Sequence, residues 1–471
     1  MRRPAPREAA AAGSPDATAP QTAEDDTPDE GAKPGTDARP ARFSRRALLG
    51  GAVGAASVLA GGSAAGFAAG RATAAPAPAG TNDIVPFTGG HQAGITTPVQ
   101  EHLHFAAFDL TTDSRDDVVA LLRRWTLAAD RMTRGLPAGP HGTDGGPYDA
   151  PPDDTGEAEG LAAANLTVTI GFGPTMFTTT GTPDGADRFG LADRRPAPLE
   201  NLPHFPADML EDARTGGDLA VQACADDPQV AVHAVRNLAR LAFGTATVRW
   251  SQLGYGRTSR TTKDQSTPRN LFGFKDGTAN IVAEDHEALA DHVWVAPGDD
   301  AGADWLAGGS YLVARRIRMT VETWDRTSLR EQENVVGRTK GHGAPLSGGS
   351  ETTAPDFTAA GSHGPLVPAD SHVALAHPSA NDGARLLRRG YNYTDGSDGL
   401  GKLDAGLFFI AFVRDPARQY IPMQNRISRS DTMMEYLRHT GSGLWAVPPA
   451  VPAGSTLGEA GAYLGQELFE A

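Results

Sequence analysis

The chain has 471 residues, with 42 Lys and Arg against 57 Asp and Glu and a formal net charge of -15. This negative balance argues against general binding of nucleic acids, which requires a basic surface. The single cysteine, Cys224, excludes an intramolecular disulfide, a zinc site with two or more thiolates, an iron–sulfur cluster and a CxxCH site for covalent attachment of a cofactor.

Residues 1–43 contain almost no apolar periodicity and consist mainly of Ala, Pro, Asp, Glu, Thr and Gly. A segment of this composition cannot bury enough apolar surface to offset its conformational entropy. The sequence therefore predicts a disordered N-terminal extension.

Residues 44–74 follow the three-part plan of a signal peptide. An arginine pair at 45 and 46 precedes an uncharged run over residues 47–70, and a small-residue cleavage site at 72–74 follows. The arginine pair favours a twin-arginine signal. A membrane anchor is the alternative, but seven glycines make the run a poor span. We expect export by the twin-arginine pathway to the periplasm, cell envelope or extracellular space, with no membrane span after cleavage.

The first half of the remaining chain shows two strand–helix–strand units. Alternating apolar residues mark the strands, and an acidic turn after Ser114 marks the start of the first helix. The predicted elements are a strand at 100–110, a helix from 115 to 127, strands at 166–172 and 218–224, a helix at 228–243 and a strand at 245–250, with a long Gly/Pro/Asp-rich loop at 135–160. This order is typical of a ferredoxin-like fold.

The second half repeats this plan more loosely. Its predicted elements are a strand at 310–321, a helix at 324–336, a strand at 407–413 and a helix at 427–439, with loop-rich segments at 337–370 and 391–404. The sequence thus predicts an α+β protein with two ferredoxin-like domains, one over residues 85–262 and one over residues 263–460.

Three short segments carry the polar residues that point to chemistry. The segment GFKDG at 273–277 places the carboxylate of Asp276 between two glycines, which tolerate positive φ and close approach of the backbone. Asp276 is therefore expected to project from a turn. The other two segments are SHV at 371–373 and RRGYNY at 388–393.

Taken in order, these segments resemble the dye-decolorising peroxidase family. GFKDG is similar to the family's GxxDG motif, SHV to its proximal haem-ligand segment, and RRGYNY to the segment that bears its distal arginine. Further similar segments lie at 312–319, 337–340, 343–346 and 407–412. The resemblance covers roughly residues 90–460 and, with the predicted signal, is closest to the exported, deferrochelatase-like branch.

The resemblance implies a fold of the dimeric α+β barrel type, with antiparallel sheets and one non-covalent haem b per subunit in the C-terminal half. It implies that His372 is the proximal iron ligand and that Asp276 acts on peroxide as general base and then general acid. Arg388 would supply positive charge as the O–O bond breaks, and Asp415 would accept the proximal histidine N–H. The other residues implied in haem binding are Gly273, Phe274, Lys275, Gly277, Thr278, Arg338 and Arg389.

Two assignments within this site stay open. His377, five residues after His372, is a rival iron ligand, because the family usually has Asn near this position and Arg where Ala374 stands. Between the tandem arginines, the spacing favours Arg388 for the distal face, which leaves Arg389 for a haem propionate or a structural pair.

The resemblance implies a peroxidase that uses hydrogen peroxide to oxidise dyes, phenols or other small reductants. The alternatives are a deferrochelatase, which releases iron from haem and works with components of an iron-uptake system, and a haem carrier without enzymatic activity. A homodimer is also expected. Because an unperturbed Asp has a pKa of about 3.9, we predict an acidic optimum, at roughly pH 4–5.

Overall fold

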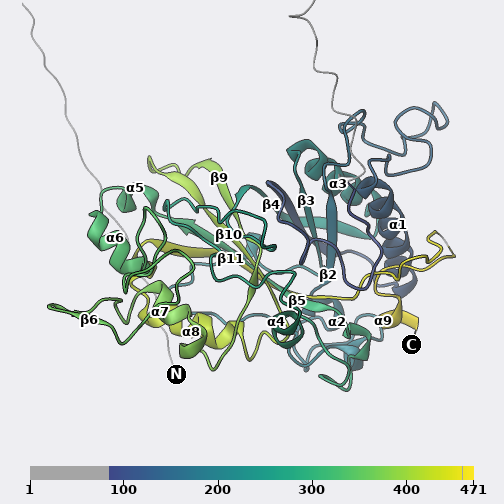
Figure 1. Cartoon of the computed structure of the whole chain (residues 1–471). Helices are drawn as coiled ribbons and strands as arrows, with labels where there is room; N and C mark the ends of the chain where they lie inside the picture. The colour runs from purple at the N-terminus through teal and green to yellow at the C-terminus, as the bar shows by residue number, and fades with distance from the viewer. Residues whose placement is uncertain (1–83, 459, 471) are drawn as a thin grey trace, which may run out of the picture. The chain divides into compact units, whose positions relative to one another are not determined.

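The computed structural model describes residues 84–458 and 460–470, and its strands come from both halves of the chain (Figure 1). The strands are β1 His102–Leu110, β2 Thr167–Phe172, β3 Leu219–Ala225, β4 Ala246–Arg257, β5 Ser310–Met319, β8 Leu387–Arg388, β9 Tyr391–Ser397, β10 Leu403–Val413 and β11 Leu437–Val447. A separate hairpin joins β6 Ala360–Gly361 to β7 Gly364–Pro365.

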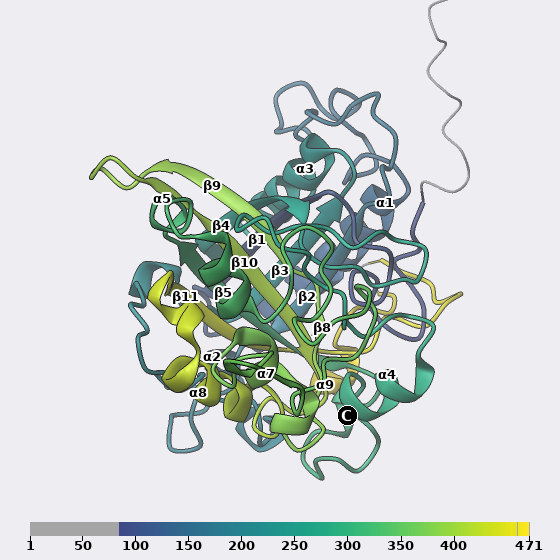
Figure 2. The ribbon, with the colours of Figure 1, turned by 60° about the vertical axis from the view of Figure 1, so that its left-hand side comes forward.

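The long strands close into one antiparallel barrel. Their order is β5-β11-β2-β3-β1-β4-β9-β10, and β10 pairs back with β5 from Gly406↔Arg318 to Val413↔Tyr311. The two halves meet at two seams, where β4 pairs with β9 and where β11 pairs with β2 through Ala446↔Phe172. Figure 2 shows β9, β10 and β5 passing in front of the strands of the first half.

Each half has the strand order of a ferredoxin-like unit. When the four long strands of each half are numbered in chain order, both halves have the spatial order 4-1-3-2. This order is β4-β1-β3-β2 in the first half and β11-β5-β10-β9 in the second. The predicted α+β fold with two ferredoxin-like halves is therefore confirmed. All described residues fall into one compact unit by their contacts, and the domain boundary at residues 262 and 263 stays a prediction.

Large aromatic side chains fill the barrel. Phe105 lies 5.2 Å from Trp250, 5.2 Å from Phe408 and 5.4 Å from Trp445, measured between ring centroids. Cys224 is fully buried in the same cluster. Along β1 and β3, alternate side chains point into this interior, and the other set belongs to the core that packs against α1 and α3.

The helices cover the outside of the barrel (Figure 1). They are α1 Arg115–Thr133, α2 Pro174–Phe177, α3 Pro228–Leu241, α4 His286–His292, α5 Val321–Trp324, α6 Leu329–Val336, α7 His372–Ala376, α8 Tyr420–Ser430 and α9 Gln466–Glu470. Helix α3 contacts β1 and β3 and packs beside α1. The side chain of Ser114 caps α1 by accepting a hydrogen bond from the Asp117 N–H at 3.2 Å.

The structure corrects three predicted elements in the second half. The predicted helix at 427–439 is wrong, because α8 ends at Ser430 and residues from Leu437 onward pair with β5 as strand β11. The predicted helix at 324–336 is broken, because Ser328 caps a new helix at Leu329. The segment at 391–404 holds β9, whose Tyr391 and Tyr393 are buried inside the barrel.

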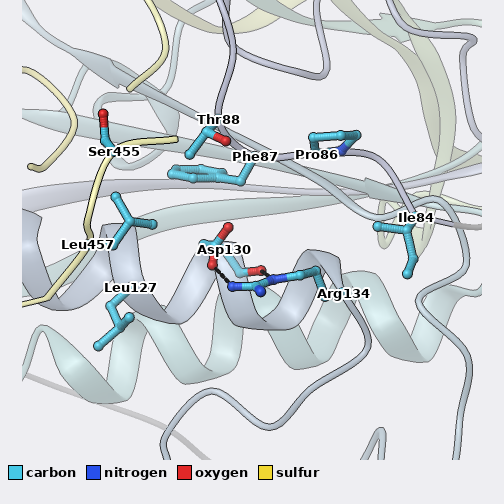
Figure 3. Close-up of a pocket in the computed structure, with 9 residues that line it drawn as sticks. All are labelled: Ile84, Pro86, Phe87, Thr88, Leu127, Asp130, Arg134, Ser455 and Leu457. Atoms are coloured by element: carbon cyan, nitrogen blue, oxygen red, sulfur yellow. Dashed lines mark hydrogen bonds and ion pairs between the residues drawn. The ribbon is translucent and has the colours of Figure 1, made fainter. Parts of the chain in front are cut away.

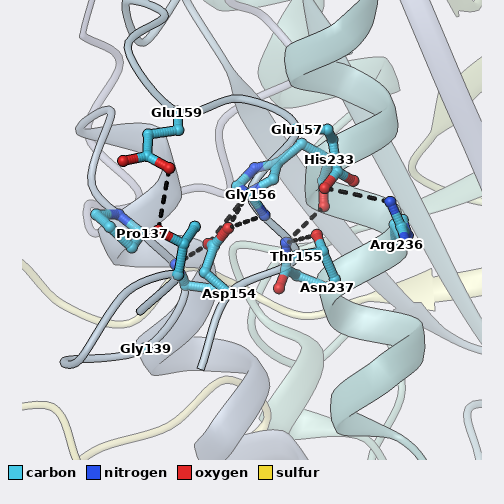
Figure 4. Close-up of polar contacts among 12 residues, drawn as sticks. Pro137, Gly139, Asp154, Thr155, Gly156, Glu157, Glu159, His233, Arg236 and Asn237 are labelled. Atoms are coloured by element: carbon cyan, nitrogen blue, oxygen red, sulfur yellow. Dashed lines mark hydrogen bonds and ion pairs between the residues drawn. The ribbon is translucent and has the colours of Figure 1, made fainter. Parts of the chain in front are cut away.

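The long loop at 135–160 has neither helix nor strand and is held to α3 by Asp154 (Figure 4). The Asp154 carboxylate lies 2.9 Å from His233 Nε2 and accepts hydrogen bonds from the N–H groups of Ala138 and Gly156, both at 2.7 Å. Burial alone would raise the pKa of Asp154, but these hydrogen bonds hold it below its ordinary value.

The extension predicted at 1–43 and the signal predicted at 44–74 lie outside the described residues. Among the residues that the structure does describe, no helix has both the length and the apolar character that crossing a membrane requires.

Candidate active site

A tight turn presents Asp276. Its backbone N–H bonds to Pro268 O at 2.9 Å, and Arg269 and Lys275 form an antiparallel bridge across the turn. Gly277 has φ +88° and packs so closely that a Cβ there would lie 2.9 Å from Ser259 Cα. A side chain at this position would collide with backbone, so the second glycine of GFKDG is a steric requirement of the turn.

Asp276 forms an ion pair with Arg388. Asp276 Oδ1 accepts a hydrogen bond from Arg388 Nη1 at 2.7 Å, and the two side chains are 15% and 28% exposed. Arg388 belongs to the short strand β8, where it pairs with Ala411 of β10. The structure therefore brings together two residues that are 112 positions apart in the sequence, as the resemblance implies.

Arg389 points elsewhere. Its guanidinium is fully buried, with Nη1 donating to Thr97 O at 2.6 Å and Nη2 bonding to Gln100. Adjacent residues of an extended chain project to opposite sides, so only one of the tandem arginines can face Asp276. The geometry therefore favours Arg388, which lies beside Asp276, over Arg389, which makes a structural contact.

His372 begins helix α7 and is paired with Asp431. Its Nδ1 lies 2.7 Å from Asp431 Oδ2, and Asp431 Oδ1 accepts the N–H of Met433 at 2.8 Å. The Asp431 side chain is fully buried, whereas that of His372 is 35% exposed. Because a carboxylate only accepts hydrogen bonds, Nδ1 carries the proton and Nε2 keeps a lone pair for a metal.

The same contacts set the electrostatics of His372. Burial alone would lower the pKa of His372, but the Asp431 charge and hydrogen bond raise it above its ordinary value. The carboxylate of Asp276 also raises, and the guanidinium of Arg388 also lowers, the pKa of His372. The three predicted catalytic and ligand residues therefore share one electrostatic environment.

The assignment of Asp415 as the partner of His372 is wrong. Asp415 Oδ1 accepts the N–H groups of Ala417 and Arg418, at 2.8 and 3.2 Å, and Oδ2 lies 3.4 Å from Arg418 Nε. Asp415 therefore stabilises the turn before α8, and the acid on the histidine comes from the other end of that helix.

His377 makes local contacts at the end of α7. Its Nδ1 lies 2.8 Å from Ser379 Oγ, and its ring lies 5.0 Å from that of Phe357. Burial, assisted by the charge of Arg338, lowers the pKa of His377. Since His377 lacks a carboxylate partner among the described residues, the geometry favours His372 as the metal ligand.

The remaining predicted residues lie in or beside the GFKDG turn. Phe274 packs in a buried cluster, with its ring 5.9 Å from that of Trp324. Lys275 and Thr278 both bond to Glu351. Arg338 Nη1 donates to Gly343 O at 2.7 Å and to Glu351 O at 2.8 Å.

Gly273 has φ +81°, so this glycine also requires the left-handed region, and Lys340 Cε would lie 2.9 Å from its Cβ. Gly273 thus shapes the start of the same turn. Direct contact of Gly273, Phe274, Lys275, Gly277, Thr278 and Arg338 with haem stays a prediction.

Two family models match the chain and together cover most of it. The N-terminal domain of Dyp-type peroxidases matches residues 92–256, and the C-terminal domain matches residues 267–452. The chain belongs to the Dyp-type peroxidase family. The predicted family and the predicted class of enzyme, a haem peroxidase, are thereby confirmed.

Relatives of this family member fall under two names. A dye-decolorizing peroxidase of Thermobifida fusca is 38% identical over 396 residues, which are 81% of this chain and 84% of the relative. A deferrochelatase of Escherichia coli is 35% identical over 398 residues, which are 83% of this chain and 89% of the relative.

Solved structures of the family are also similar. The DyP-type peroxidase from Streptomyces coelicolor has a TM-score of 0.72 and 40% identity, and the match covers 82% of this chain and 97% of that chain. The DyP-type peroxidase from Cellulomonas bogoriensis has a TM-score of 0.70 and 38% identity, with coverage of 82% and 98%.

Sequence reasoning missed several residues of this Dyp-type site. Asp431 was missed because the predicted helix at 427–439 runs across it. An Asp before Thr432-Met433 is a typical helix N-cap, and this signal could have marked the end of α8. Asn270 and Asn280, which flank the GFKDG turn, bond to Asp276 and Arg388. Nothing in the sequence indicates where these two amides point.

A cavity of about 490 Å³ lies between α1 and the segments 84–88 and 455–457 (Figure 3). Its lining includes Phe87 and the ion pair of Asp130 with Arg134 on α1. It contains none of the predicted catalytic or ligand residues, so it carries no part of the peroxidase assignment.

Proposed function

We propose that this protein binds one non-covalent haem b per subunit and uses hydrogen peroxide to oxidise small reductants such as dyes and phenols. The observation that carries the proposal is the Asp276–Arg388 ion pair in the same electrostatic environment as a histidine held by a buried carboxylate. Membership of the Dyp-type peroxidase family supports it.

The residues present fit a haem iron. His372 offers Nε2 from a partly exposed ring whose Nδ1 is held by Asp431, which is the donor set of a proximal ligand. The one cysteine is buried inside the barrel on β3, which supports a non-covalent cofactor. Bound haem supplies the redox chemistry, by taking two oxidising equivalents from peroxide and passing them to the reductant.

Asp276 moves the proton in this reaction. Its carboxylate accepts the proton of hydrogen peroxide and returns it to the departing oxygen, which leaves as water. Both Asp276 oxygens accept N–H hydrogen bonds, one from Asn270 and one from Arg388, so the carboxylate is held in one orientation. Arg388 holds fixed positive charge beside that carboxylate, where negative charge grows as the O–O bond breaks.

Asp431 would control how strongly His372 donates to a bound iron. Asp431 accepts the Nδ1–H of His372, fixes the tautomer and makes the ring a more basic ligand. Because Asp431 is also bonded to the Met433 N–H, its carboxylate cannot rotate freely. Asp431, at the end of α8, therefore fixes the orientation of the His372 ring.

Reconstitution with haem tests the assignment. We expect one haem per chain in wild type, loss or a large change of the Soret band in His372→Ala, and little change in His377→Ala. A wild-type spectrum retained in His372→Ala, or lost in His377→Ala, would contradict the choice of ligand.

Release of iron from haem is the second candidate function, and the match to the Escherichia coli deferrochelatase supports it. Both functions use the same site, so one preparation distinguishes them. Holoenzyme incubated with peroxide and a dye should bleach the dye while an iron chelator detects little free iron. Stoichiometric iron release with formation of iron-free porphyrin would identify the second function.

The predicted twin-arginine signal supports a further proposal, which is export of the protein to the periplasm, cell envelope or extracellular space. Replacement of Arg45 and Arg46 by Lys is expected to retain the precursor in the cytoplasm. A homodimer and iron-uptake partners stay predictions, for which the mass of the holoenzyme in solution and co-purification from the cell envelope are the measurements.

A further inference from the structure

Two asparagines bracket the turn that carries Asp276, and each holds one member of the Asp276–Arg388 pair. We propose that Asn270 and Asn280 are positioning residues, with Asn270 fixing the orientation of the Asp276 carboxylate and Asn280 fixing Arg388 beside it. The inference rests on the proposed function, because it deepens the role of the same site.

Asn270 reaches Asp276 through a side chain that cannot rotate freely. Its Nδ2 donates to Asp276 Oδ2 at 3.2 Å, while its Oδ1 accepts the N–H of Phe272 at 3.1 Å. Reversing the amide would lose both hydrogen bonds and leave two acceptors facing each other. Asp276 Oδ2 therefore always meets a donor, and this hydrogen bond holds the carboxylate in one orientation.

Asn280 fixes the backbone of Arg388. Its Oδ1 accepts the Arg388 N–H at 2.7 Å, and its Nδ2 donates to the carbonyl oxygens of Arg388 and Arg260, both at 2.8 Å. Strand β8 has only two residues and pairs on one edge with β10. The buried Asn280 side chain replaces a neighbouring strand on the other edge, so it determines where the Arg388 side chain begins.

The charged groups near Asp276 come from several elements. Arg388 lies on β8 and His372 on α7, and the pKa of His372 responds to both members of the ion pair. Within the turn, Lys275 is paired with Glu351. Asn270 is the uncharged contact of Asp276, so a carboxylate at position 270 would create a like-charge pair.

Asn270→Asp in the haem-loaded protein tests the first half of the proposal. Two adjacent carboxylates share a proton, so the acidic limb of the pH profile of kcat/KM for peroxide should move upward by about one pH unit or more. Asn270→Ala removes only the orienting donor, so it should lower kcat/KM for peroxide about tenfold.

Cyanide provides a readout without turnover. Hydrogen cyanide must lose its proton as it binds iron, so its binding rate to resting holoenzyme should depend on Asp276. In Asn270→Asp the pH midpoint of cyanide binding should therefore move together with that of kcat/KM. A role in folding alone would lower stability and leave both midpoints in place.

Asn280→Ala tests the second half. It should lower kcat/KM for peroxide about tenfold, with unchanged pH midpoints and an unchanged KM for the reductant. Asn237 is the matched control, because it is fully buried on α3 and makes two side-chain hydrogen bonds away from the site. Asn237→Ala should reduce stability and leave kcat/KM unchanged.

The outcomes separate this proposal from the proposed function. A wild-type kcat/KM in Asn270→Ala, or wild-type midpoints for both turnover and cyanide binding in Asn270→Asp, would overturn the role of Asn270. A kcat/KM in Asn280→Ala equal to that of Asn237→Ala would overturn the role of Asn280. Failure of the proposed function would give a different result, because the wild-type holoenzyme itself would not react with peroxide.

Discussion

At the scale of single residues, chemically similar side chains take different roles because of the partners they meet. Asp431 and Asp415 lie at opposite ends of α8, yet only Asp431 contacts His372. Arg388 and Arg389 are adjacent, yet one faces a carboxylate and the other faces backbone carbonyls. Each pair therefore supplies a variant and its matched control.

Asp431→Asn should weaken the donation from His372 to a bound metal, because an amide is a poorer and uncharged acceptor. We expect the haem to remain bound, the rate of its reaction with peroxide to fall about tenfold or more, and the reduction potential of the iron to rise. Stopped-flow absorbance and a spectroelectrochemical titration measure these effects. Asp415→Asn should behave like wild type, and the opposite ranking would restore Asp415 as the partner.

The two arginines should separate activity from stability. Arg388→Leu should abolish most peroxide turnover with little loss of unfolding free energy, because the side chain is partly exposed. Arg389→Leu should cost about 2–3 kcal/mol of unfolding free energy, since it leaves buried acceptors such as Thr97 O without a donor. Urea titrations and peroxidase assays on both variants give the comparison. An Arg389→Leu variant that loses kcat but keeps the wild-type unfolding free energy would contradict the prediction.

At the scale of elements, the site is built from short pieces that the sequence marks poorly. The GFKDG turn could be predicted, because two glycines around an Asp have a clear steric meaning. The break at Asp431 was missed, because helical periodicity continues from α8 into the turn and the strand that follows and outweighs the N-cap signal of Asp431. Pairing of Leu437 and His439 with β5 overrides that local preference, and only the tertiary fold supplies this pairing.

The long loop at 135–160 should respond to acid through Asp154 (Figure 4). The pKa of Asp154 is lowered in the folded state, so its stabilising effect is present above the unfolded value of about 3.9 and is lost as the pH falls through the folded value. Asp154→Asn should lose about 2 kcal/mol at pH 7 and show a weaker decline in stability below pH 4.

Thermal unfolding between pH 3 and pH 7 measures this effect of Asp154. Asp149→Asn, an exposed change in the same loop, should stay within about 0.5 kcal/mol of wild type. An Asp154→Asn variant as stable as wild type at pH 7 would show that the loop is held by other contacts.

At the scale of the whole barrel, the two ferredoxin-like halves share one closed sheet. Composition and periodicity predict each half, but not the seams β4–β9 and β11–β2, because strand pairing across halves has no local signature. The resemblance of the motifs to a known family supplied what periodicity could not, namely that Asp276, His372 and Arg388 act together.

The closed barrel predicts that both halves unfold together. Trp125 and Trp305 lie in the core between the sheet and the segments that cover it, whereas Trp250 and Trp445 lie inside the barrel. Urea unfolding followed by tryptophan fluorescence and by far-ultraviolet circular dichroism should give coincident transitions. Two separated transitions would show that each half is stable without the seams.

The central claim is that Asp276 moves the proton of peroxide at a haem held by His372. Stopped-flow mixing of holoenzyme with hydrogen peroxide, in wild type and Asp276→Asn, tests it most directly. The account predicts a fast change of the Soret band in wild type, with an acidic optimum near about pH 4–5, and a rate at least about a hundredfold lower in Asp276→Asn. Equal rates in the two proteins, or a wild-type optimum above pH 7, would contradict it.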